Sequence, residues 1–158
     1  QISNARLILS ESARFTSSSK IMAYFLATAY VESKLIPSEE KLSENPRIRK
    51  VQQHSFDIGY QGRGYIHFSG PTTYTRLLNE LRAEGEKQVA PKDLMDPRIA
   101  AKALVLGAVK GLFTGYSILQ GLSGTHDFSH ARRAFNGEDR AREIQALAEM
   151  ILGENTEL

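Results

Sequence analysis

Residues 17–40, SSSKIMAYFLATAYVESKLIPSEE, decide the fold of this chain. Between Ile21 and Val31 nearly every side chain is apolar or small. A helix that is apolar on almost every side is packed by neighbours all round, so this run predicts a buried helix. The serines at 17–19 offer N-caps, and Pro37 prevents the helix from continuing more than a few residues further. We therefore expect a central helix of about four turns.

Glu32 stands at the far end of this helix. Ile21, Phe25 and Thr28 are spaced so that they share one helix face, and Glu32 continues that face. Partial burial and the negative end of the helix dipole both favour the protonated form of a carboxyl group in this position. A carboxyl group that keeps its proton near neutral pH suits general acid catalysis. An ordinary exposed glutamate at a helix end fits the same pattern, and such glutamates outnumber functional ones.

Two further carboxylates, Glu39 and Glu40, follow after a short loop. An inverting glycoside hydrolase uses one carboxyl group as acid and a second as base, roughly 6.5–9.5 Å apart, with a water molecule between them. A helix end and the loop after it can reach that separation. A solvated pair of surface charges fits the same spacing, so the spacing alone leaves both interpretations open.

The composition is that of a globular domain. The chain has 158 residues, of which 41% are hydrophobic and 24% charged, and we expect one domain over residues 1–158. No apolar run approaches the length that crosses a bilayer, so membrane insertion is not expected. The net charge of +2 suits an anionic polymer better than it argues for nucleic acid. Without cysteine, disulfides and thiolate metal sites are excluded. Because the chain begins at Gln1, we expect it to be part of a longer protein, with any export signal outside it.

The remaining segments predict a mainly helical domain with one small β element. The segment YQGRGYIHFSG, residues 60–70, indicates a hairpin or extended piece, with strand-like residue types at 65–68. Residues 41–59 are polar and without clear periodicity, so we expect an irregular segment that lines a cleft. Helices are expected in residues 2–15, from Pro71 to Gly85, from Pro97 to about 108, between 115 and 121, over 129–135, and from about 138 to 152.

Histidine spacing argues against a metal site. Histidines 54, 67, 126 and 130 do not show the spacing of metal ligands, so neither a metal nor another cofactor is expected. His67 and Ser69 would share one side of the predicted strand, where they line a cleft or simply a β surface. Asn136 followed by glycine is most simply a helix C-cap. Arg132 and Arg133 are either solvated and salt-bridged residues or ligands of an anionic glycan.

Four segments, taken in order, resemble glycoside hydrolase family 19. They are AYFLATAYVES (23–33), YQGRGYIHFSG (60–70), DPRIAAKALVLGAVKGLFTG (96–115) and ARRAFNG (131–137). The likeness is to the chitinase-like endolysins of bacteria and phages, and it covers most of residues 20–152. It implies a lysozyme-like helical fold, a small β-hairpin beside the active-site cleft, and inverting hydrolysis of a β-1,4-linked amino-sugar polymer.

The resemblance also implies roles for the acidic residues. Glu32 falls on the general acid of the family, although Val31 stands where a histidine usually precedes it. The general base lies in the loop beyond. Glu40 is our choice for it, Glu39 is the close alternative, and Glu44 is a third candidate.

Other positions are implied to bind water or sugar. Ser69 matches a hydroxyl that positions the attacking water, and His67 replaces the usual glutamine. Thr73 stands where an asparagine that contacts substrate is common. Asn136 matches an asparagine that contacts sugar, and Tyr60 is expected beside it in the sugar subsites.

From these observations we expect a monomeric endo-acting glycosidase that cuts peptidoglycan at the bacterial cell wall, in the periplasm or outside the cell. Chitin hydrolysis by the same chemistry is the nearest alternative. A glycan-binding module of the same fold that has lost turnover is another. The sequence leaves open whether the source is a phage lysis system with a holin, a secreted effector with an immunity protein, or a housekeeping enzyme.

Overall fold

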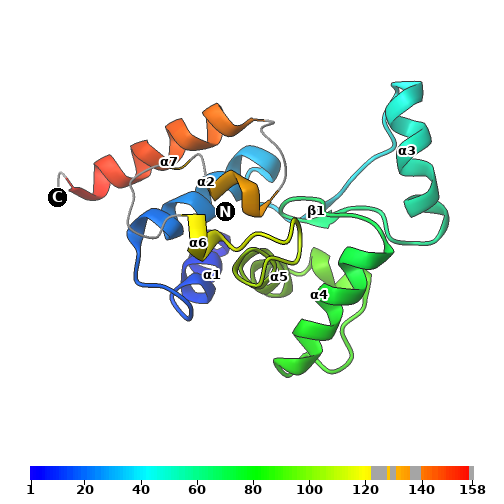
Figure 1. The fold of residues 1–158 in the computed structure, drawn as a ribbon, viewed down its shortest axis with the longest axis horizontal. Coiled ribbons are helices and arrows are strands. Elements are labelled where there is room, and N and C mark those ends of the chain that lie inside the picture. The colour runs from blue at the N-terminus through cyan, green and yellow to red at the C-terminus, as the bar shows by residue number, and fades with distance from the viewer. Residues whose placement is uncertain (122–127, 129–130, 136–139, 157–158) are drawn as a thin grey trace.

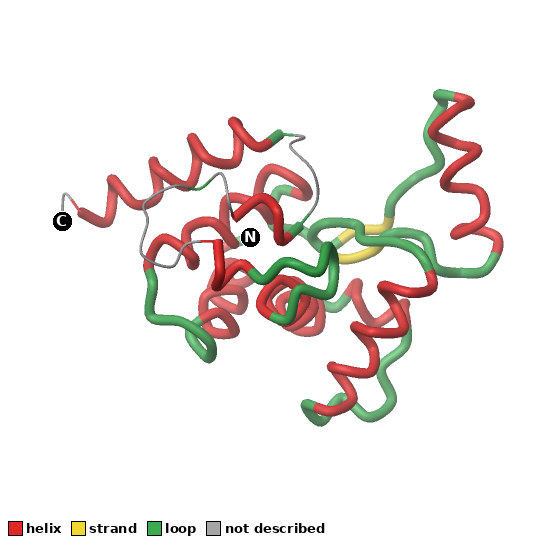
Figure 2. Tube along the Cα trace, in the orientation of Figure 1, coloured by secondary structure: helices red, strands yellow, loops and turns green. Residues whose placement is uncertain are grey.

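The computed structural model describes residues 1–121, 128, 131–135 and 140–156. It is mainly helical, with a small antiparallel sheet of two strands, so the predicted mainly helical class and the small β element are confirmed. Figures 1 and 2 show the arrangement. The elements are α1 (Ile2–Ser12), α2 (Ser19–Ser33), β1 (Ser38–Glu39), α3 (Pro46–Asp57), β2 (Arg63–Gly64), α4 (Pro71–Ala83), the 3-10 helix η1 (Pro91–Met95), α5 (Pro97–Val109), α6 (Ile118–Gly121), the 3-10 helix η2 (Ala131–Ala134) and α7 (Ala141–Thr156).

Helix α2 is the central helix that the sequence predicts. The side chain of Ser18 caps it by accepting a hydrogen bond from the backbone N–H of Ile21 at 3.3 Å. Lys34 ends it in the left-handed conformation, three residues before Pro37. Helices α1 and α7 pack against α2 (Figure 1). Its buried residues lie on nearly every side: Ile21, Ala23, Tyr24, Phe25, Ala27, Thr28, Ala29 and Val31.

Helix α5 separates two hydrophobic cores and contributes to both. Asp96 caps it by accepting from the N–H of Arg98 at 2.9 Å, with Pro97 in the first turn, as the sequence predicts. One face of α5 packs with α1, α2 and α7, through Ala100, Ala101, Leu104, Val105 and Ala108. The other packs with α4 and η1, through Ile99, Ala103 and Leu106. The apolar stripe predicted for α4 is buried in this second core: Tyr74, Leu77, Leu78 and Leu81.

The β element differs from the prediction in its position. Ser38 pairs with Gly64 and Glu39 with Arg63, so the first strand lies in the loop after α2. Residues 65–67, predicted as strand, form a tight turn that returns the chain to a single bridge between Arg63 and Phe68. Their strand-like residue types have a different cause, because Tyr65 is buried in the first core and Phe68 packs on the second.

Helix α3 corrects the prediction of an irregular segment over residues 41–59. Asn45 caps it by accepting from the N–H of Arg47 at 3.0 Å, and Pro46 occupies its first turn. None of the residues Pro46–Asp57, all of them described, is buried, and Figures 1 and 2 show the helix projecting from the rest of the molecule. Its apolar side chains, Ile48 and Val51 among them, are exposed and belong to neither core, and the cap and the proline were the sequence signals of its start.

Candidate functional site

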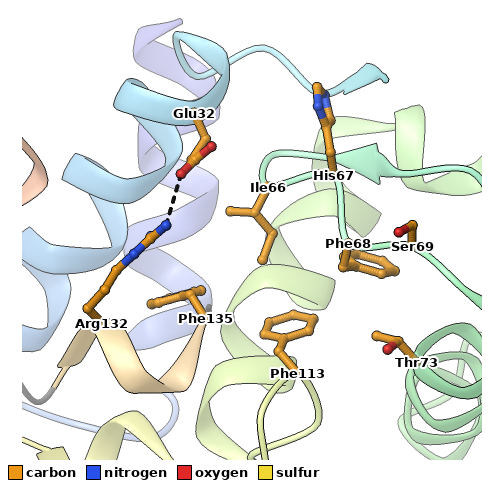
Figure 3. A pocket seen from close by; sticks show the side chains of 9 residues that line it. All are labelled: Glu32, Ile66, His67, Phe68, Ser69, Thr73, Phe113, Arg132 and Phe135. Carbon is orange, nitrogen blue, oxygen red and sulfur yellow. Dashed lines mark hydrogen bonds and ion pairs between the residues drawn. The ribbon is translucent and has the colours of Figure 1, made fainter. Parts of the chain in front are cut away.

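A pocket of about 290 Å³ opens between the end of α2, the turn after β2, the start of α4 and η2 (Figure 3). Its walls combine charged groups, hydroxyl groups and aromatic rings. It is lined by Glu32, Ile66, His67, Phe68, Ser69, Thr73, Phe113, Arg132 and Phe135. Four of the residues predicted for the site therefore meet in one pocket: Glu32, His67, Ser69 and Thr73.

Glu32 reaches this pocket from the last turn of α2. Its side chain is 24% exposed, and its Oε1 lies 3.3 Å from Nη2 of Arg132, whose side chain is 7% exposed. The guanidinium and carboxylate groups attract each other by charge, and Arg132 orients the Glu32 side chain at the pocket. The sequence offered Arg132 as a solvated or salt-bridged residue or as a glycan ligand, and it named no partner. Its pairing with Glu32 joins distant parts of the chain, and no local pattern signals it.

A buried phenol lies close to this ion pair. Burial raises the pKa of Tyr24 to about 12, the charge of Glu32 adds to the shift, and the charge of Arg132 opposes it. Tyr24 therefore stays neutral at physiological pH. Its ring stacks on Phe128 at 5.7 Å between centroids and packs beside Phe135, which lines the pocket.

The opposite wall of the pocket carries His67, Ser69 and Thr73 (Figure 3). Nε2 of His67 lies 2.6 Å from Oγ of Ser38 on β1, which fixes the orientation of the ring. Phe68 stacks on Phe113 with their centroids 5.4 Å apart, so the base of this wall is aromatic. Residues 65–67 form a turn instead of a strand, and His67 and Ser69 line the same pocket, which is one of the two placements that the sequence left open.

The predicted base candidates do not line this pocket. Oε1 of Glu40 accepts from the N–H of Gly62 at 2.6 Å, and its Oε2 accepts from the amide of Gln52 at 3.1 Å. Glu39 is exposed, accepts from Gln61 at 2.7 Å, and pairs with Nε of Arg63 at 3.5 Å. The two carboxylates thus hold the segment that leads into β2, and Glu40 also ties it to α3. Glu44, the third candidate, is exposed and lies outside the described pocket lining.

Two predicted sugar contacts have other positions. Tyr60 packs on Tyr74 at 5.2 Å between ring centroids, against the second core, and is not among the described residues that line the pocket. Asn136 lies outside the described residues, so its predicted sugar contact stays a prediction.

Comparisons with protein-family models, with curated proteins and with solved structures find no match for this chain. The likeness described above therefore rests on the sequence segments themselves. Among the described residues, no group of three or more histidine or acidic side chains is placed to hold a metal ion. Within the same residues, no helix has both the length and the apolar character needed to cross a membrane.

Proposed function

We propose that this protein is a glycoside hydrolase that cleaves the β-1,4-linked amino-sugar backbone of peptidoglycan at the bacterial cell wall. The observation that carries the proposal is Glu32. Its carboxyl group stands at the tip of the central helix, partly buried, and opens into a pocket with a hydroxyl-bearing wall opposite. Such a group is placed to give a proton to the glycosidic oxygen of a bound glycan.

The walls of the pocket suit a sugar. Ser69 and Thr73 offer hydroxyl groups that can exchange hydrogen bonds with a sugar ring or hold a water molecule. The stacked rings of Phe68 and Phe113 offer an apolar surface for the C–H face of the same ring. Together with the mildly basic net charge of +2, these features favour a polar, anionic glycan polymer as the substrate.

In the proposed reaction, Glu32 donates its proton as the bond between the anomeric carbon and the bridging oxygen breaks. Water attacks the anomeric carbon from the opposite side, which inverts the configuration. Glu32 is then a carboxylate, and the guanidinium group of Arg132 stabilises the negative charge that proton transfer leaves behind. The ion pair therefore favours the stage of the reaction that follows proton transfer.

The test is Glu32→Gln, which keeps the size of the side chain and removes the transferable proton. Release of reducing ends from purified sacculi should fall by roughly 10²–10⁴-fold, the range for losing a general acid. Glu44→Gln, at an exposed position outside the described lining, is the matched control and should leave the rate unchanged. Circular dichroism checks that both variants fold. Unchanged release by Glu32→Gln would refute the assignment.

A binding module without turnover is the second candidate. The engagement of Glu32 by Arg132, and of Glu39 and Glu40 by the β element, favours it. Such a module would bind glycan and release no reducing ends at all. Comparing sacculi with soluble chitin oligomers, with products identified by mass, separates peptidoglycan hydrolysis from chitin hydrolysis.

A further inference from the structure

The proposed hydrolysis needs a group that takes a proton from the attacking water on the side of the pocket facing Glu32. The carboxylates of Glu39 and Glu40 are hydrogen-bonded to the β element and are absent from the described lining. In the lining that the structure describes, Glu32, Arg132 and His67 are the ionisable side chains. An arginine does not accept a proton, and Glu32 is the proposed acid.

We propose that His67 is the general base of this site, an inference that rests on the proposed function. In the reaction, a ring nitrogen of His67 accepts a proton from water while the water oxygen forms a bond to the anomeric carbon. The bond from that carbon to the bridging oxygen breaks, and the bridging oxygen receives the proton of Glu32. His67 then releases its proton to solvent and Glu32 takes one up from solvent, so no other reactant is needed.

The hydrogen bond to Ser38 prepares the ring for this role. Nε2 of His67 lies 2.6 Å from the Ser38 hydroxyl oxygen. When Nε2–H donates to that oxygen, Nδ1 carries the lone pair and is the nitrogen that can accept a proton. Ser38 thus holds the ring, and in this tautomer Nδ1 is the accepting nitrogen, much as a third group orients the base in other sites. Ser69, two residues further on, supplies a hydroxyl group that can hold the water beside it.

The backbone holds His67 in an unfavourable conformation. Its φ is +52°, a left-handed conformation that is strained for a residue with a side chain. Such conformations are unfavourable and persist where the surrounding structure enforces them, often at functional sites. Here the bridge from Arg63 to Phe68 closes the turn, and Gly62 packs so closely on the His67 carbonyl that it leaves no room for a Cβ atom.

The geometry across the pocket fits the pair of roles. Figure 3 shows Glu32 descending from α2 on one wall and His67 rising from the turn after β2 on the other, with Ile66 between them. An acid and a base on opposite walls leave space for the sugar and for the water that attacks it, which is the arrangement that inversion requires.

The test uses His67→Gln, which keeps a hydrogen-bonding side chain that cannot accept a proton from water. Glutamine is also the residue that the family resemblance expects here, so a mere sugar contact would tolerate it. We expect kcat on peptidoglycan oligomers to fall by roughly 10²–10⁴-fold with KM little changed. His67→Asn should lose kcat similarly, and since asparagine tolerates positive φ, backbone strain is excluded as the cause.

Azide distinguishes a base from a structural residue. As an anion it attacks the anomeric carbon without losing a proton, so it should restore turnover to His67→Gln and give a glycosyl azide of inverted configuration. Glu40→Gln is the competing variant, and its turnover should not be rescued. Rescue of Glu40→Gln in place of His67→Gln, or full activity of His67→Gln, would overturn the inference while leaving the hydrolase intact. A wild-type protein that releases no reducing ends would overturn both.

Discussion

Arg132 of η2 and Glu32 of α2 form an ion pair across 100 positions of sequence, with 3.3 Å between Nη2 and Oε1. The arginine is nearly buried and the glutamate is partly exposed toward the pocket. Arg132 is thus held by the protein interior, and Arg132 in turn orients Glu32. This pair connects the central helix with the segment after α6, and it decides where the carboxyl group of Glu32 lies.

Arg132→Met should therefore destabilise the protein and impair the site. Removing the cation leaves Glu32 without this partner, which we expect to cost about 1–3 kcal/mol in the free energy of unfolding. The matched control is Arg142→Met at an exposed position of α7, where a change within about 0.5 kcal/mol is expected. Urea denaturation measures both variants. Equal losses in the two would show that the ion pair contributes nothing specific.

Two glycines should respond in opposite ways to the same substitution. Gly62→Ala places a Cβ atom against the backbone carbonyl of His67, so the turn must shift, and we expect a loss of about 1–3 kcal/mol from overpacking. Gly153→Ala adds a methyl group in open space within α7, where alanine favours the helix by up to about 1 kcal/mol. Thermal unfolding of both variants measures the difference. A neutral Gly62→Ala would contradict the close packing of the turn.

Stability should fall at alkaline pH through three buried phenols. Burial raises the pKa of Tyr24, Tyr65 and Tyr74 to about 12 each, against an unfolded value near 10. A raised folded pKa means that the unfolded chain loses these protons first. Their contribution is therefore complete below pH 10 and is lost as the pH rises from about 10 to 12. Urea midpoints measured from pH 9 to 12, together with phenolate absorbance, test this. A midpoint that is constant across this window would contradict the burial.

Tyr74→Phe refines this test. The Tyr74 hydroxyl donates to the backbone carbonyl of Gln61 at 2.5 Å and lies 3.3 Å from Nη1 of Arg63. Its removal should cost about 1–2 kcal/mol near neutral pH. It should also make the alkaline decline shallower, because one of the three titrating phenols is gone. A decline as steep as in the wild type would remove Tyr74 from this explanation.

Short sequence patterns predicted the helices that are specified by residues close together in the sequence. The apolar run of α2, the stripe of α4 and the Asp96-Pro97 start of α5 are each contained within a few turns, and each was confirmed. Helix α3 was missed because it buries no face, although Asn45 and Pro46 marked its start. The strand prediction at 65–68 failed because burial in a turn selects the same residue types as a strand.

The sequence predicted residues that belong to the site, but it did not predict which side chains contact one another. The sequence analysis named four candidate site residues that line one pocket in the structure: Glu32, His67, Ser69 and Thr73. The contacts of Arg132 with Glu32 and of Ser38 with His67 depend on how distant elements pack. The same holds for Glu40, whose two hydrogen-bond partners lie 12 and 22 positions further along the chain.

Helix α5 also has a consequence for the width of the pocket. Glu32 belongs to α2, a helix of the first core, whereas Phe68 packs on the second core. Helix α5 lies between the two cores and contributes residues to both. Alanine supplies three of its five residues in the first core and one of its three in the second, so small side chains help to set the spacing of the two halves. A larger residue in place of one of these alanines would push the two cores further apart. Substitutions in α5 are therefore expected to change the width of the pocket, and so the size of ligand that it admits, although α5 does not line the described pocket.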